Sequence, residues 1–221
     1  MKLRSLLACL ALVFLPSRVA LAQSDEMTFR LVTPPNCGRA CPVYVLGSGR
    51  ITLDSPRQFQ ALAASLPSRR LPVYLTSQGG SLVGGIRLGL ALREYGATVS
   101  VPSGAVCASA CTYAFLGGVV RGVPQGARLG VHRFFARDAD LAQRPVPPDL
   151  ELQATALLTH YVAAMGAHPA LVNLAARVDH RTIHFLSPTE LRRYGVVTQG
   201  TPRGRPVASR ARHGKRRAAV G

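Results

Sequence analysis

Lysine and tryptophan are the residues that this chain has least of. Only Lys2 and Lys215 occur among its 221 residues, so 27 − 2 = 25 of the basic residues are arginines, and tryptophan is absent. Aromatic residues make up 6% of the chain, and without a row of them on which bases can stack, nucleic-acid binding is not expected despite a formal net charge of +17. The shortage of lysine also limits which general base the chain could use in catalysis.

Long hydrophobic runs are missing as well. The longest apolar stretch covers residues 6–15, whereas a helix needs about 20 residues to cross a bilayer. Lys2 and Arg4 precede this stretch and Ala20-Leu21-Ala22 follows it, which is the pattern of a cleaved secretory signal peptide. We therefore expect residues 1–22 to be removed and the mature chain to be periplasmic. An uncleaved anchor and a lipoprotein signal at Cys9 are alternatives that the shortness of the run disfavours.

The positive charge is unevenly distributed. Residues 1–22 carry +3 and residues 200–221 carry +7, which leaves 17 − 3 − 7 = +7 on residues 23–199, where all ten acidic residues lie. Residues 200–221 contain no acid and no apolar period, so this tail is predicted to be disordered. It could contact an anionic membrane surface, or be solvated without a partner. The predicted organisation is a signal peptide, one domain over residues 23–199, and a basic tail.

The mature chain keeps an even number of cysteines. Loss of Cys9 with the signal peptide leaves Cys37, Cys41, Cys107 and Cys111, in a compartment that favours oxidation. Four cysteines allow three pairings, and the sequence does not choose among them, although a local bridge within each Cys-x-x-x-Cys pair is a candidate. A four-cysteine zinc site is the rival interpretation, which the oxidising compartment disfavours. We expect disulfides and no metal.

The order of predicted elements indicates an α/β domain. A helix of residues 81–95 stands between two apolar strands, which is the pattern of a parallel β-α-β unit. Before this unit we predict a β-hairpin turning at residues 47–49 and a helix that Ser55 caps. The full set of predicted elements is strands 42–46, 50–53, 73–76, 98–101, 128–134 and 196–197, and helices 55–66, 81–95, 108–116, 149–165 and one from 187.

Two junctions between a strand and a helix could carry chemistry. At the first, Gly79 and Gly80 could turn backbone N–H groups toward an anion, although a plain tight turn explains a glycine pair equally well. At the second, Ser109 stands among small residues, as a nucleophile or as a helix cap. His132 and Asp179 follow, which gives a nucleophile, a base and an orienting acid in chain order. Asp179 could instead be a solvated loop acid beside its basic neighbours.

These residues also carry a family resemblance. The chain resembles the Clp protease proteolytic subunit and its clan, which includes signal peptide peptidases and crotonases. The resemblance implies a fold of repeated β-β-α units with a mainly parallel sheet. The paired cysteines around Ser109 in this chain are similar to those of secreted bacterial members of the clan. The resemblance covers about residues 42–199 and rests on four blocks in the same order, at residues 77–81, 107–110, 130–132 and 185–197.

The resemblance implies a role for each candidate residue. Ser109 corresponds to the nucleophile and His132 to the base, and Asp179 corresponds to the acid because it stands six residues before Phe185. The N–H groups of Gly79 and Ala110 would form the oxyanion hole. The implied activity is an ATP-independent serine peptidase acting on peptides or unfolded proteins, without a cofactor. The helix of residues 149–165 occupies the place of the ring-to-ring handle, so the resemblance also implies a homo-oligomer.

Two departures from the family leave an alternative open. Gln78 replaces the family's proline, and cysteines flank Ser109, so the chain could be a catalytically inactive binding or scaffold protein. Other chemistries of the clan are not expected. The lysine base of signal peptide peptidases has no counterpart except Lys215 in the tail. Coenzyme A and ATP are not expected outside the cytoplasm, which argues against crotonase chemistry and a partner ATPase.

Overall fold

The computed structural model describes residues 25–33, 43–66, 71–137, 143–144 and 146–198. The predicted signal peptide, Cys37, Cys41 and the basic tail lie outside these residues. No helix in the described part of the chain is both long enough and apolar enough to cross a membrane.

Two β-sheets form the framework of the domain. The larger has the order β1-β2-β3-β4-β6 and the smaller the order β10-β7-β5. Neighbours are parallel in the interior of the larger sheet and between β5 and β7, while β1 and β10 join antiparallel at the edges. The strands are β1 (Thr28–Val32), β2 (Tyr44–Ser48), β3 (Val73–Thr76), β4 (Thr98–Ser100), β5 (Val106–Ala108), β6 (Val120–Gly122), β7 (Arg128–Val131) and β10 (His184–Phe185).

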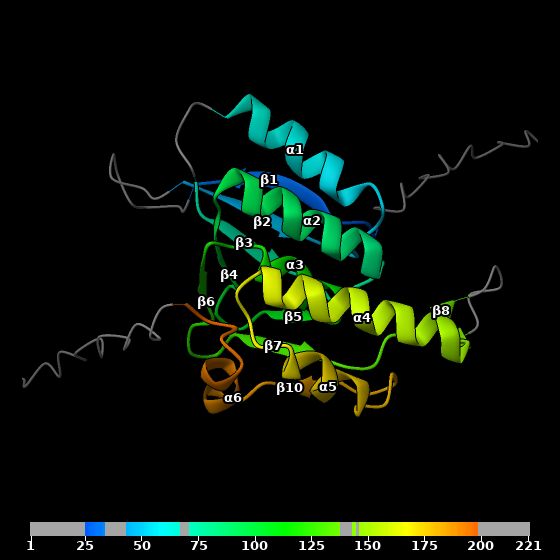
Figure 1. The fold of residues 1–221 in the computed structure, drawn as a ribbon. Coiled ribbons are helices and arrows are strands. Elements are labelled where there is room, and N and C mark those ends of the chain that lie inside the picture. Colours follow the sequence, from blue (N-terminus) through cyan, green and yellow to red (C-terminus); the bar gives the residue numbers. More distant parts are fainter. Residues whose placement is uncertain (1–24, 34–42, 67–70, 138–142, 145, 199–221) are drawn as a thin grey trace, which may run out of the picture.

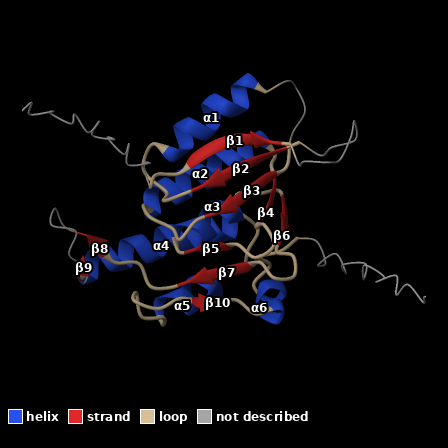
Figure 2. Ribbon diagram, turned by 180° about the vertical axis from the view of Figure 1, so that it is seen from behind, coloured by secondary structure: helices blue, strands red, loops and turns tan. Residues whose placement is uncertain are grey.

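The helices lie on one side of both sheets. Figure 1 shows them in front of the strands, and Figure 2, seen from behind, shows the strands in front. The longest helix, α4, extends beyond the others toward a small hairpin of β8 (Ala136–Arg137) and β9 (Gln143–Arg144). The helices are α1 (Ser55–Ser65), α2 (Leu82–Tyr95), α3 (Ala110–Leu116), α4 (Pro148–Ala164), α5 (Ala170–Ala176) and α6 (Pro188–Arg193).

Close packing around α3 fixes the centre of the domain. Every residue of α3 is buried. A Cβ atom added at Gly85 of α2 would lie 2.5 Å from the Ala110 carbonyl oxygen, and one added at Gly89 would collide with the Tyr161 hydroxyl. Glycine at these positions therefore allows α2 to approach both α3 and α4. Because α3 begins directly after Ser109, this packing also holds the candidate nucleophile in place.

A buried arginine joins the carboxyl ends of three helices. Arg121 is 2% exposed, and its guanidinium donates only to backbone carbonyls among the described residues. Burial lowers its pKa to about 10. The carboxyl end of a helix carries a partial negative charge, so three such ends offset a cation that has no acidic partner in this part of the chain. The acceptors are Leu116 at the end of α3 and Gly118 just beyond it, Met165 after α4, and Gly195 and Val196 after α6.

The structure corrects three local predictions. The hairpin at residues 47–49 is wrong, because β2 pairs antiparallel with β1, and residues 50–51 make only isolated bridges to other segments. Asp54 rather than Ser55 is the N-cap of α1, and the Ser55 hydroxyl accepts from the Thr52 N–H at 2.9 Å. Residues 196–197 are not a strand; the Val196 carbonyl accepts from Arg121 instead.

Candidate active site

The backbone of Ser109 is the most unusual in the described chain. Ser109 has φ 58° and ψ −125°, and it is the only residue other than glycine with a positive φ there. Such a conformation is costly and tends to occur where function requires a sharp turn. It stands between β5 and α3 in the N-cap position of that helix, as the cap interpretation expects, but its hydroxyl makes no capping hydrogen bond. The turn resembles the strand-to-helix elbow that presents a nucleophilic serine.

A glycine turn lies against Ser109. Gly79 has φ +106°, and a Cβ atom added there would lie 2.6 Å from the Ser109 Cβ. The Gly79 N–H donates to the Ser77 hydroxyl at 3.0 Å, so it is already engaged. Among the described residues, the N–H groups of Gly80 and Ala110 have no acceptor. The Gly80 N–H is therefore available to an anion, as the glycine pair predicts, whereas the resemblance implies Gly79 rather than Gly80 as the donor.

A disulfide encloses the serine. Cys107 and Cys111 are bonded, and both are fully buried. The bridge therefore links strand β5 to the first turn of α3 across Ser109. Two of the four predicted zinc ligands are consumed by this bond, so the four-cysteine zinc site is wrong. No group of three or more potential metal ligands occurs among the residues that the structure describes.

His132 follows β7 and reaches the same cavity as Ser109. Its Nδ1 lies 2.7 Å from the Arg133 carbonyl oxygen. Because a carbonyl can only accept, Nδ1 carries the proton and Nε2 is left as an acceptor. Burial lowers the pKa of His132 below its usual value, and nearby His180 lowers it further, while the carbonyl contact opposes both. The imidazole is therefore largely neutral near pH 7, as a general base must be.

Asp179 is turned toward a different partner. Its carboxylate accepts from the Arg181 side chain at 2.9 and 3.1 Å and from the Arg181 N–H at 2.9 Å. These contacts hold the pKa of Asp179 well below its usual value. No described hydrogen bond joins Asp179 to His132. The two segments are nevertheless adjacent, because the Arg133 N–H donates to the Val178 carbonyl at 3.0 Å.

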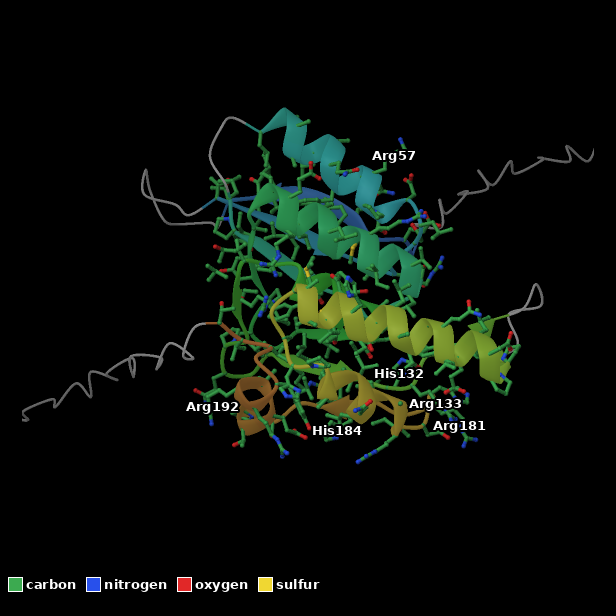
Figure 3. All side chains as sticks on the ribbon, in the orientation of Figure 1. Arg57, His132, Arg133, Arg181, His184 and Arg192 are labelled. Atoms are coloured by element: carbon green, nitrogen blue, oxygen red, sulfur yellow. A yellow bond between two sulfur atoms is a disulfide. The ribbon has the colours of Figure 1, made fainter. Side chains whose placement is uncertain are left out.

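One large cavity brings most of the candidate residues together. Its volume is about 1310 Å³, and Ser109 and His132 both line it. Asp179 is not part of its wall. Figure 3 shows the side of the domain where His132 lies, with Arg133 and Arg181 further out toward the edge. The predicted site residues in the cavity wall are Gly79, Ser109, Ala110 and His132.

Comparison with solved structures identifies the fold. The chain is similar to 1510-N, a membrane-bound stomatin-specific protease, in a serine-to-alanine mutant, with TM-score 0.52 and 20% identity over 67% of this chain and 73% of that one. A lysine-to-alanine mutant of the same protease, in complex with a substrate peptide, gives TM-score 0.52 and 19% identity over 67% and 69%. The chain has the fold of the Clp protease clan. ClpP1 from Listeria monocytogenes gives TM-score 0.49 and 16% identity over 67% and 84%.

No family model and no curated protein matches the chain, so the assignment of this ClpP-like fold rests on the solved structures. The fold itself confirms the predicted α/β class, and the parallel pairing holds in the interior of the sheets but not at their edges. The described residues of this ClpP-like domain contain no lysine. A lysine base is therefore not available within the described part of the cavity, whereas His132 is.

Proposed function

We propose that the chain is an ATP-independent serine hydrolase that acts on peptides or unfolded proteins in the periplasm. The observation that carries the proposal is that Ser109, at a strained strand-to-helix turn, shares a cavity with His132, whose pKa is lowered. A positive φ at a serine costs free energy that packing must offset. The presence of this conformation at Ser109, beside the neutral imidazole of His132, favours a catalytic role for the serine.

The residues suggest a sequence of proton transfers. Nε2 of His132 removes the proton from the Ser109 hydroxyl while the serine oxygen attacks the carbonyl carbon of the substrate. The N–H groups of Ala110 and Gly80 stabilise the oxyanion that forms, and the Gly79 N–H joins them once it is released from the Ser77 hydroxyl. The protonated imidazole then gives its proton to the leaving amine. A water molecule, deprotonated in turn by His132, hydrolyses the acyl-enzyme and releases Ser109.

Two groups can orient the His132 imidazole, which is the role of the third member of a catalytic triad: the Arg133 carbonyl and the Asp179 carboxylate. In the present arrangement the carbonyl orients the imidazole, since it accepts from Nδ1. Asp179 would complete a Ser-His-Asp triad only after exchanging Arg181 for His132. We therefore propose Asp179 as the third member of the triad in an arrangement in which this ion pair has opened.

Fluorophosphonate labelling of the mature chain tests the proposal. We expect covalent labelling of Ser109 that disappears in Ser109→Ala. No labelling of a folded protein under either oxidising or reducing conditions would contradict the proposal. That result would favour the second candidate, a scaffold that keeps the fold without catalysis. The observation that favours a scaffold is the pairing of Asp179 with Arg181 together with the engaged Gly79 N–H.

Self-association is part of the proposal. On α4, Leu152 is 71% and Leu157 is 55% exposed, which is unusual for leucines on a helix that already packs against the domain. We propose that α4 contacts another copy of the chain, and light scattering on the purified protein would measure the assembly. The predicted contact of the basic tail with an anionic membrane remains a separate proposal, for which sedimentation with anionic vesicles is the test.

A further inference from the structure

Thr112 is a fully buried polar residue to which no task has been assigned. It belongs to α3, three residues after Ser109, and it does not line the cavity, so it is not placed to touch a substrate there. A threonine hydroxyl inside a helix commonly donates to a carbonyl three or four residues earlier in the same helix. The Thr112 hydroxyl instead donates to the carbonyl of Gly130 on β7 at 2.7 Å. This bond runs from a helix to a strand and therefore links two parts of the candidate site.

Three hydrogen bonds join Thr112, Ser109 and Gly130 in a closed ring. The Gly130 carbonyl accepts from the Thr112 hydroxyl and also, at 3.0 Å, from the Ser109 N–H. The Ser109 carbonyl accepts in turn from the Thr112 N–H at 2.9 Å. Both peptide groups that flank the Cα atom of Ser109 are therefore held. Because φ and ψ describe how these two planar groups are rotated about that atom, the ring fixes the strained conformation of the serine.

The same ring reaches the candidate oxyanion donor and the candidate base. The Ala110 N–H belongs to the same planar peptide group as the Ser109 carbonyl, so the bond from the Thr112 N–H also sets the direction of that donor. On the other side of the ring, Gly130 stands two residues before His132, on the strand that leads directly to it. The carbonyl that holds the serine turn is therefore fixed to the segment that carries the imidazole.

We propose that Thr112 is a positioning residue of the catalytic site, whose hydroxyl sets the placement of the Ser109 hydroxyl relative to the His132 imidazole. This inference rests on the proposed hydrolase function. A nucleophile and its base work together only within a narrow range of distance and direction, so a displacement of about 1 Å can lower the rate by a factor of about 100. A strained turn that loses one of the hydrogen bonds holding it relaxes toward ordinary backbone angles, and this relaxation moves the serine oxygen away from the imidazole.

Two pairs of proteins isolate the effect of the hydroxyl. Thr112→Val replaces the hydroxyl of the wild type by a methyl group, and Thr112→Ala lacks only the hydroxyl that Thr112→Ser keeps. The Gly130 carbonyl retains the Ser109 N–H as a donor in every case, so no buried acceptor is left unpaired. With a fluorophosphonate as the probe, we expect the maximal rate of labelling to be about tenfold higher in the hydroxyl-bearing member of each pair. The probe concentration that gives half of this rate should be unchanged, because the hydroxyl acts on the reaction and not on binding.

Ser100→Ala is the matched control. The Ser100 hydroxyl also donates to a carbonyl of a neighbouring strand, that of Gly122 at 2.9 Å, but Ser100 does not line the cavity, so this variant should be labelled at the wild-type rate. Equal maximal rates within either folded pair would overturn the assignment of Thr112 while the serine assignment stands. Loss of folding in both variants without the hydroxyl would assign it to stability and overturn the proposal as well. Failure of wild-type labelling would instead overturn the proposed function.

Discussion

The Cβ position of Gly79 points at the Cβ of Ser109, and the two would be 2.6 Å apart if Gly79 carried a side chain. The glycine turn and the serine turn are therefore built against each other, so neither can move without the other. Ala108 and Ala110 contribute the remaining close contacts to this position. The geometry around the nucleophile thus depends on a residue thirty positions earlier in the chain.

Replacing Gly79 by alanine should disable the site. Gly79→Ala forces an unfavourable positive φ and a collision with Ser109, so we expect fluorophosphonate labelling to slow at least about tenfold and the free energy of unfolding to fall by about 2 kcal/mol. Gly166→Ala is the matched control. Gly166 has φ +74° with no atom within 4 Å of an added Cβ, so it should cost about 1 kcal/mol and keep normal labelling. Equal labelling in both variants would contradict the predicted role of Gly79.

Arg181 should restrain the nucleophile if Asp179 is the third triad member. Arg181→Gln releases the Asp179 carboxylate for His132, so the rate of labelling of Ser109 should rise several-fold, whereas Asp179→Asn should lower it. Arg177→Gln is the control, because it removes an exposed arginine that is not hydrogen-bonded to Asp179. If Asp179→Asn and Arg181→Gln both label at the wild-type rate, the Arg133 carbonyl alone is the partner of His132.

The rate of labelling should follow the neutral form of His132. Because the pKa of His132 lies below the usual value of 6.5, more than half of the imidazole is neutral at pH 6.5, and the rate there should exceed half of its plateau. The rate should decline only as the pH falls further. His180→Gln removes a neighbouring charge that lowers this pKa, so the midpoint should move to higher pH. A wild-type midpoint above 6.5 would be inconsistent with a buried base.

Loss of the Cys107–Cys111 bond should weaken both the fold and the site. The bond closes a loop of five residues, for which chain entropy gives a stabilisation of about 2 kcal/mol. The double variant Cys107→Ala with Cys111→Ala should therefore unfold at lower denaturant concentration, and labelling of Ser109 should be slower because the strained turn is less restrained. Labelling that is identical in the double variant and in wild type would exclude control of the site by oxidation.

Local signals in the sequence predicted much of the fold. Gly96 ends α2 in the left-handed conformation, as expected of a glycine after a helix, and Ser187 and Glu190 form a capping box where the predicted last helix begins. These features depend on a few neighbouring residues, so the sequence alone is sufficient to identify them. Strands β5 and β10, of three and two residues, were missed because they are too short to show a period. They depend on hydrogen bonds to β7, and β5 also on hydrogen bonds to Ser77.

The candidate site was predictable in part for the same reason. The elbow at Ser109 and the glycines at residues 79–80 are local features, and the cavity contains both together with His132. The partner of Asp179 was not predictable. Arg181, two residues away, competes for this carboxylate with the His132 imidazole, which only the tertiary structure brings near. The disulfide pairing was one of three possibilities, and the observed one is local.

The guanidinium of Arg121 also sets where the domain can be cut. Two of its acceptors, Gly195 and Val196, follow the last helix, and its backbone N–H donates to the Thr198 hydroxyl at 2.7 Å. A truncation before residue 195 would leave a buried cation with fewer carbonyls and would expose the core beneath Val196. Shortened versions for crystallisation or fusion should therefore retain the chain at least through residue 198, five residues past the last helix.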